Sequence, residues 1–204
     1  MTSIDSVTLQ VNDISAAQQF YDAAFGLGDT IKLAQSDDPT DGFRGFTLSL
    51  VTAQPSTAQS FYDSAVAAGA TPIKPFAKSF WGVGGTVSAP DGTIWKFASS
   101  AKKDTGPATR QIDQIVLLLG ATDVAATKAF YSGQGLPIGK SFMNKYVQFD
   151  LPDSPIQLAL YGHKSLAKDA GVPADGSGSH RLVVNGSIGA ATDPDGFGWV
   201  PAAG

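Results

Sequence analysis

The sequence predicts an α+β protein of 204 residues, built as two tandem halves. Two repeats indicate this. The turn Ala-Pro-Asp-Gly at 89–92 precedes Thr-Ile-Trp-Lys-Phe, and a related Asp-Pro-Asp-Gly-Phe-Gly-Trp stands at 193–199. Ile-Asp-Ser-Val-Thr-Leu at 4–9 recurs as Ile-Asp-Gln-Ile-Val-Leu at 112–117. Pro, Asp and Gly are typical turn residues. We therefore predict halves at 1–100 and 112–204, joined by a polar linker at 101–111.

The first half opens with a predicted strand and helix. Apolar and polar residues alternate over 6–11, which is typical of a half-buried strand. Asp13 or Ser15 then provides an N-cap, and apolar residues follow at helical spacing. Gly26 and Gly28 end this helix.

A second helix is predicted in the same half. It repeats the Ala-Gln-x-Phe-Tyr-Asp pattern of the first. Ser56 and Gln59 have the spacing of a capping box, and Gly69 is a typical helix stop. Alternating or β-branched runs predict the remaining strands of this half, at 30–34, 43–51, 71–74, 84–88 and 93–98.

The second half repeats this order less completely. A helix with another Phe-Tyr pair is predicted at 123–134, and a Gly/Ser-rich loop at 176–179 precedes a strand that begins at His180. His163 is expected at the edge of a strand. The strands of this half are predicted at 112–119, 146–151, 156–161, 180–184 and 197–200.

Composition excludes several function classes. The net charge is −4, and no basic patch is visible among 14 Lys and Arg residues, so nucleic acid is not an expected partner. No apolar run approaches the roughly 20 residues of a membrane span, so we expect no membrane partner. The absence of cysteine excludes disulfides and thiolate metal sites and fits a cytoplasmic location.

The order and doubling of these elements resemble the vicinal oxygen chelate superfamily, which includes glyoxalases, bleomycin-resistance proteins and extradiol dioxygenases. The resemblance covers nearly the whole chain and implies βαβββ modules whose paired sheets form a cup around a ligand. It is carried by residues 4–11, 13–28, 82–97, 112–119, 123–136 and 193–199.

The resemblance also shows which residues depart from the superfamily pattern. Its enzymes usually place a metal-ligating His early in the first strand and a Glu after the hairpin Trp. Here the first position holds Ser6 or Gln114, and the second holds Lys96 or Val200. An ammonium and an isopropyl group offer a divalent ion no lone pair. We therefore predict no metal and no cofactor, although glutamine, the residue type of Gln114, occurs at this place in some glyoxalases.

The candidate ligand-binding residues are polar or aromatic side chains expected near the cup. Lys96 either holds an anionic ligand or extends outward past a shallow cup, and Arg44 is a weaker anion candidate. The Trp81 indole either stacks on a flat ligand or packs in the core, whereas Trp95 and Trp199 are predicted core residues. The full set is Ser6, Gln10, Trp81, Lys96, Gln114, Tyr161 and His180.

Three functions remain open from the sequence. The first is metal-independent binding of a small organic ligand, similar to drug sequestration by bleomycin-resistance proteins. The second is a metal-dependent lyase or isomerase of glyoxalase type that acts on a small carbonyl compound or thiol adduct, with Gln114 and His180 as metal ligands. The third is a degenerate partner module without an open pocket. The incomplete halves complete each other either within the chain or in a homodimer.

Overall fold

The computed structural model describes residues 2–80 and 82–202, so the predicted ligand residue Trp81 lies outside the described residues. Its N-terminal part contains, in order, β1 Ile4–Val11, α1 Ile14–Ala24, η1 Gly28–Thr30, β2 Ile31–Gln35, β3 Thr40–Gly42, β4 Phe46–Val51, α2 Pro55–Ala67, β5 Thr71–Ser79, β6 Gly82–Ser88 and β7 Ile94–Ser99. Its C-terminal part contains β8 Gln114–Ala121, α3 Val124–Gly133, β9 Ile138–Phe142, β10 Tyr146–Phe149, β11 Ile156–Gly162, α4 His163–Ala170, β12 Gly176–Gly178, β13 Leu182–Gly186, β14 Ala191–Thr192 and β15 Gly198–Pro201.

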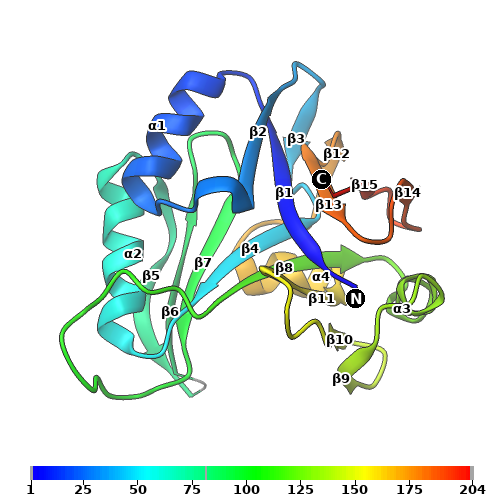
Figure 1. Ribbon diagram of the computed structural model, residues 1–204. Coiled ribbons are helices and arrows are strands. Elements are labelled where there is room, and N and C mark those ends of the chain that lie inside the picture. The colour runs from blue at the N-terminus through cyan, green and yellow to red at the C-terminus, as the bar shows by residue number, and fades with distance from the viewer. Residues whose placement is uncertain (1, 81, 203–204) are drawn as a thin grey trace.

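Two sheets form the body of the molecule, and each takes strands from both parts of the chain (Figure 1). The eight-stranded sheet has the order β5-β6-β7-β4-β8-β11-β10-β9, and the five-stranded sheet has the order β14-β15-β13-β1-β2. Antiparallel pairing of β4 with β8 joins the parts in the large sheet, with Leu48 opposite Leu117. Antiparallel pairing of β1 with β13 joins them in the small sheet, with Val7 opposite Val184.

The strand order shows a repeating unit shorter than half the chain. In β4-α2-β5-β6-β7 and in β8-α3-β9-β10-β11, the last strand returns parallel to the first. The small sheet contains two shorter versions: β1-α1-β2, and β13-β14-β15 without a helix. The observed architecture confirms the predicted α+β class.

One large core packs α1, α2 and α3 against the sheets. The Trp95 and Phe97 side chains of β7 are buried there with Leu48 and Phe61, and Trp199 is buried in the same cluster. Both hairpin tryptophans are therefore core residues, as predicted. Figure 1 shows α1 and α2 side by side on one flank of the molecule and α3 on the opposite flank.

The helix ends follow local capping chemistry, with one correction. The Asp13 carboxylate accepts from the Ala16 amide at 2.9 Å, so Asp13 rather than Ser15 is the N-cap of α1. The predicted Ser56–Gln59 capping box is wrong, because the N-cap of α2 is Gln54 and Pro55 opens the helix. The Ser56 backbone amide instead donates to the Asp104 carboxylate at 2.7 Å.

The segment 101–111 contains no helix or strand, yet it is tied to the helical layer. The Gln54 side chain donates to the Pro107 carbonyl at 2.7 Å and accepts from the Thr105 amide at 2.9 Å. The Arg110 guanidinium lies 3.9 Å from the centre of the Phe61 ring and donates to the Ala24 carbonyl at 2.6 Å. These contacts hold the connection against α2 and the end of α1.

Six short elements have no counterpart among the predicted ones: η1, β3, β9, β12, β14 and α4. Strand β9 is exposed along its length, and β12 occurs within the predicted Gly/Ser loop and pairs with β3. Gly176 permits that pairing, because a Cβ there would lie 2.1 Å from the Phe43 carbonyl oxygen. Helix α4 begins at His163, so the prediction of a strand edge there is wrong.

Candidate ligand cleft beside helix α4

Helix α4 covers the face of the large sheet that α2 and α3 leave free. On β7, Trp95 points into the main core, whereas Ile94 packs in a second cluster with Phe43 and the α4 residues Leu166 and Ala170. Alternation along a strand places neighbouring side chains on opposite faces. The residues of this face therefore form a separate small core under α4.

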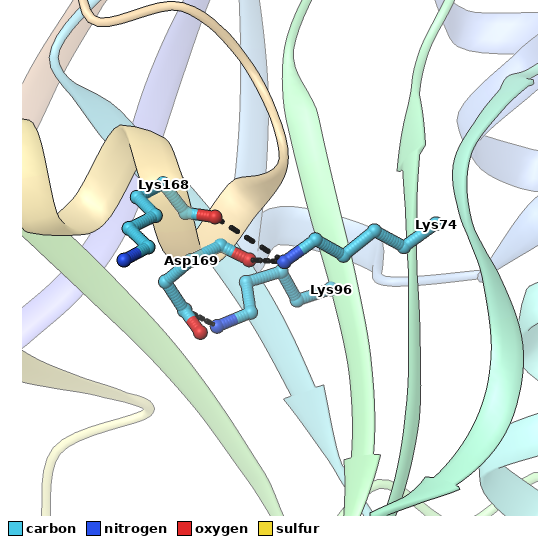
Figure 2. Close-up of polar contacts among 4 residues, drawn as sticks. All are labelled: Lys74, Lys96, Lys168 and Asp169. Carbon is cyan, nitrogen blue, oxygen red and sulfur yellow. Dashed lines mark hydrogen bonds and ion pairs between the residues drawn. The ribbon is translucent and has the colours of Figure 1, made fainter.

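Two lysines from the sheet hold the last turn of α4 (Figure 2). The Lys96 ammonium of β7 pairs with the Asp169 carboxylate. The Lys74 ammonium of β5 donates to the carbonyl of Asp169 at 2.6 Å and to that of Lys168 at 3.3 Å. Cations are favourable at a helix C-terminus, where carbonyl groups lack partners within the helix. Gly171 closes the helix with a φ of 88°.

The side chains at the superfamily's metal-ligand positions do not fit a metal ion. Lys96 is a cation already paired with Asp169, and Gln114 is exposed at the start of β8, opposite Val51. His180 contacts the Arg44 carbonyl, and the next residue, Gly45, accepts from the Gly120 amide near the far end of β8. At strand spacing, Gly120 lies about 20 Å from Gln114. Residues 2–80 and 82–202 contain no group of three His, Cys, Asp or Glu arranged to hold a metal.

A cleft of about 450 Å³ opens beside the end of α4. Its apolar walls come from four places in the chain: Phe43 before β4, Ile73 on β5, Ile94 on β7, and Val172 with Pro173 after α4. This volume lies within the 300–1,000 Å³ typical of small-molecule sites. The apolar walls favour an organic ligand over an inorganic ion.

Arg44 is the cation that lines this cleft within the described residues. Its Nη2 donates to the Asp91 carbonyl at 2.6 Å, and Gly92 leaves room for that contact. Burial lowers the pKa of the Arg44 guanidinium, and the nearby Asp91 carboxylate opposes that shift. Asp41 and Asp175 also line the cleft and are exposed.

The predicted candidates on β1 lie away from this cleft. Ser6 and Gln10 are in the small sheet, where Ser6 is buried opposite Asn185. The Ser6 hydroxyl has no hydrogen-bond partner among the described residues. The backbone N–H of Gln10 donates to the Arg181 carbonyl at 2.9 Å. The structure does not bring these two side chains together with Lys96.

Tyr161 and His180 occupy two further locations. Tyr161 of β11 packs against the α4 cluster, on the same sheet face as Ile94. His180 precedes β13, which begins at Leu182 rather than at His180 as predicted. Its Nδ1 lies 2.7 Å from the Arg44 carbonyl oxygen and its Nε2 lies 3.1 Å from that of Asp195. The ring also stacks on Phe197, with centroids 4.0 Å apart.

Sequence reasoning missed most of the cleft. Of its walls, only Arg44 was noted as a candidate, because its cation stands between apolar and glycine residues. Ile73, Ile94 and Val172 are ordinary apolar residues on separate segments. No local pattern marks them, because the cleft depends on where α4 lies.

Comparisons with known proteins identify the fold. No protein-family model matches the chain, and no curated protein matches it in sequence. The structure is similar to that of a glyoxalase I variant from Zea mays, with 12% identity, a TM-score of 0.58 and coverage of 98% of this chain and 91% of that one. Glyoxalase I from Zea mays itself is 14% identical, with a TM-score of 0.56 and coverage of 91% of this chain and 75% of that one. A putative dioxygenase from Bacillus subtilis is 13% identical, with a TM-score of 0.56 and coverage of 95% of this chain and 71% of that one.

These likenesses show that the chain has the vicinal oxygen chelate fold predicted from its sequence. At such identities they carry the fold alone and not the chemistry. Among the described residues, none of the helices has the length and apolar character needed to cross a bilayer.

Proposed function

We propose that the protein binds a small organic molecule, without a metal, in the cleft beside α4. The observation that carries this proposal is the 450 Å³ cleft with apolar walls and one half-buried guanidinium. A few polar anchors in a mainly apolar site are typical of small-molecule binding. Binding of this kind requires shape and burial but no ligated ion.

The contacts around Lys96 support the metal-independent form of this function. Asp169 neutralises the cation that stands where superfamily enzymes usually place a carboxylate, and the apolar residue Leu166 is fully buried on the same face. Ligand binding is therefore assigned to the cleft beside the end of α4 and not to the sheet face that α4 covers. Sequestration of a drug or metabolite is the simplest activity that such a site provides.

Titration calorimetry with 2-naphthol, a flat and neutral probe, tests the proposal. Val172→Trp places an indole in the cleft and is expected to abolish binding. Val200→Trp is the matched control, because Val200 is 39% exposed on β15 of the small sheet. EDTA is expected to leave the affinity unchanged. Loss of binding with EDTA, or equal binding by both tryptophan variants, would contradict the proposal.

A degenerate partner module is the second candidate function. The packing of α4 on the sheet face favours it, since that face has a filled core instead of an open cup. Failure of a broad set of flat and aliphatic probes to bind would support this candidate over ligand binding.

A further inference from the structure

We infer that the ligand of the cleft is a monocarboxylate with an apolar body, and that Arg44 receives its carboxylate. This inference rests on the proposed function and specifies the ligand class of the same site.

The hydrogen bonding of Arg44 is incomplete. A guanidinium carries five N–H donors. Within residues 2–80 and 82–202, the Arg44 side chain makes one hydrogen bond, from Nη2 to the Asp91 carbonyl. Asp91 itself is engaged by the Tyr21 hydroxyl at 2.8 Å and by the Thr93 amide at 2.8 Å. The remaining donors of a half-buried Arg44 are thus available to an anion.

The charge available to a ligand also points to Arg44. The two sheet lysines that contact the last turn of α4 are already engaged: Lys96 by the Asp169 carboxylate, and Lys74 by backbone carbonyls. Arg44 is the cation in the described lining of the cleft, and it provides one positive charge there. The exposed carboxylates of Asp41 and Asp175 in the same lining disfavour a second negative charge on the ligand. A monoanion matches this arrangement better than a phosphate monoester or a dicarboxylate.

The shapes of the partner groups also match. Arginine binds carboxylates through parallel N–H donors in a planar fork. Contact with the Asp91 carbonyl anchors Nη2 of the Arg44 guanidinium, and the apolar side chains of Ile73, Ile94 and Val172 line the same cleft. A carboxylate at Arg44 would place the apolar part of the ligand against these walls.

Calorimetry with three probes of one shape tests the inference: 2-naphthoate, its neutral isostere 2-naphthamide, and 2-naphthyl phosphate. Wild type is expected to bind naphthoate about tenfold or more tightly than naphthamide, as charge-assisted hydrogen bonds predict. Naphthyl phosphate is expected to bind more weakly than naphthoate. Arg44→Gln is expected to remove the preference for naphthoate while retaining the naphthamide affinity. Arg44→Lys is expected to keep part of the preference for naphthoate.

Lys140→Gln is the charge-matched control, because Lys140 is exposed on β9, and it is expected to leave all three affinities unchanged. Equal wild-type affinity for naphthoate and naphthamide would overturn the carboxylate inference and leave the proposed function standing. A parallel loss of both ligands in Arg44→Gln would show that Arg44 only shapes the cleft, and would also overturn it. Absence of binding by all probes would overturn the proposed function as well.

Discussion

The Tyr131 hydroxyl donates a hydrogen bond to the Asp193 carboxylate across 2.8 Å, although the residues are 62 positions apart in the chain. The same hydroxyl accepts from the Trp199 indole at 3.1 Å. Helix α3 is thereby joined to the turn and strand that close the small sheet. This buried contact links the helix of the Phe-Tyr pair to the hairpin at 193–199.

The earlier part of the chain contains the counterpart. Tyr21 of α1 donates to Asp91 at 2.8 Å and accepts from the Trp95 indole at 3.4 Å. The two turns are not equivalent residue by residue. Asp91 belongs to its Pro-Asp-Gly turn, whereas Asp193 precedes the corresponding turn by one residue.

Replacing either tyrosine by phenylalanine is expected to destabilise the protein. Tyr131→Phe leaves the Trp199 indole N–H without its acceptor in a buried site, which costs about 1–3 kcal/mol. Tyr21→Phe is expected to cost a similar amount. Urea unfolding measures the change, with Tyr161→Phe as the control, since no hydrogen bond of its hydroxyl is found among the described residues. Equal stability of the Tyr131 and control variants would contradict this role.

The protein is expected to lose folding stability at alkaline pH, because the same two tyrosines then ionise. Burial, together with the neighbouring aspartates, raises the pKa of Tyr21 and of Tyr131 well above the ordinary value of 10.0. The folded state therefore holds these protons more tightly than the unfolded state. Their stabilisation is complete below about pH 10 and is lost as the pH rises above it.

Urea titrations between pH 8 and 11 measure this dependence. The double variant Tyr21→Phe/Tyr131→Phe is expected to have a shallower decline above pH 10 than wild type. An unchanged slope would show that other groups control alkaline unfolding.

Apolar packing, more than the ion pair, is expected to hold α4 on the sheet. Leu166 is fully buried, so Leu166→Ala is expected to cost about 2–5 kcal/mol. The side chains of Lys96 and Asp169 are 22% and 43% exposed, so a double-mutant cycle to alanine is expected to give a coupling of about 0–1 kcal/mol. Urea unfolding measures both, and a coupling larger than the Leu166 effect would reverse this ranking.

Separated halves are expected not to fold. Fragments 1–105 and 106–204 would each lose the β4–β8 and β1–β13 pairings, which join the two parts in both sheets. Each fragment alone is expected to give collapsed amide NMR spectra or to aggregate, and coexpression is expected to restore a native spectrum. Two dispersed spectra from monomeric single fragments would contradict this expectation.

Local patterns were sufficient to predict much of the fold. Alternation predicted β1 and β4, and the helix signals at Asp13 and Gly69 predicted helix ends that the structure confirms. Strand β9 was missed because it is exposed, and helix α4 was missed because it has only eight residues, most of them polar. Short elements of this kind depend on tertiary contacts more than on periodicity.

The candidate site was less predictable for the same reason. Lys96 lies two residues after Ile94 on β7 and therefore on the same sheet face, but its partner Asp169 belongs to the missed helix. The cleft walls come from segments as distant as Phe43 and Val172. A sequence pattern reports on residues a few positions apart, so it does not reveal such a convergence.

The measurement that tests the account most directly is the location of bound 2-naphthol by isotope-filtered NOEs to methyl groups. We expect NOEs from the ligand to the methyl groups of Ile73, Ile94 and Val172, which line the cleft. NOEs confined to Val183 and Val200 of the small sheet, with none to these three side chains, would contradict it.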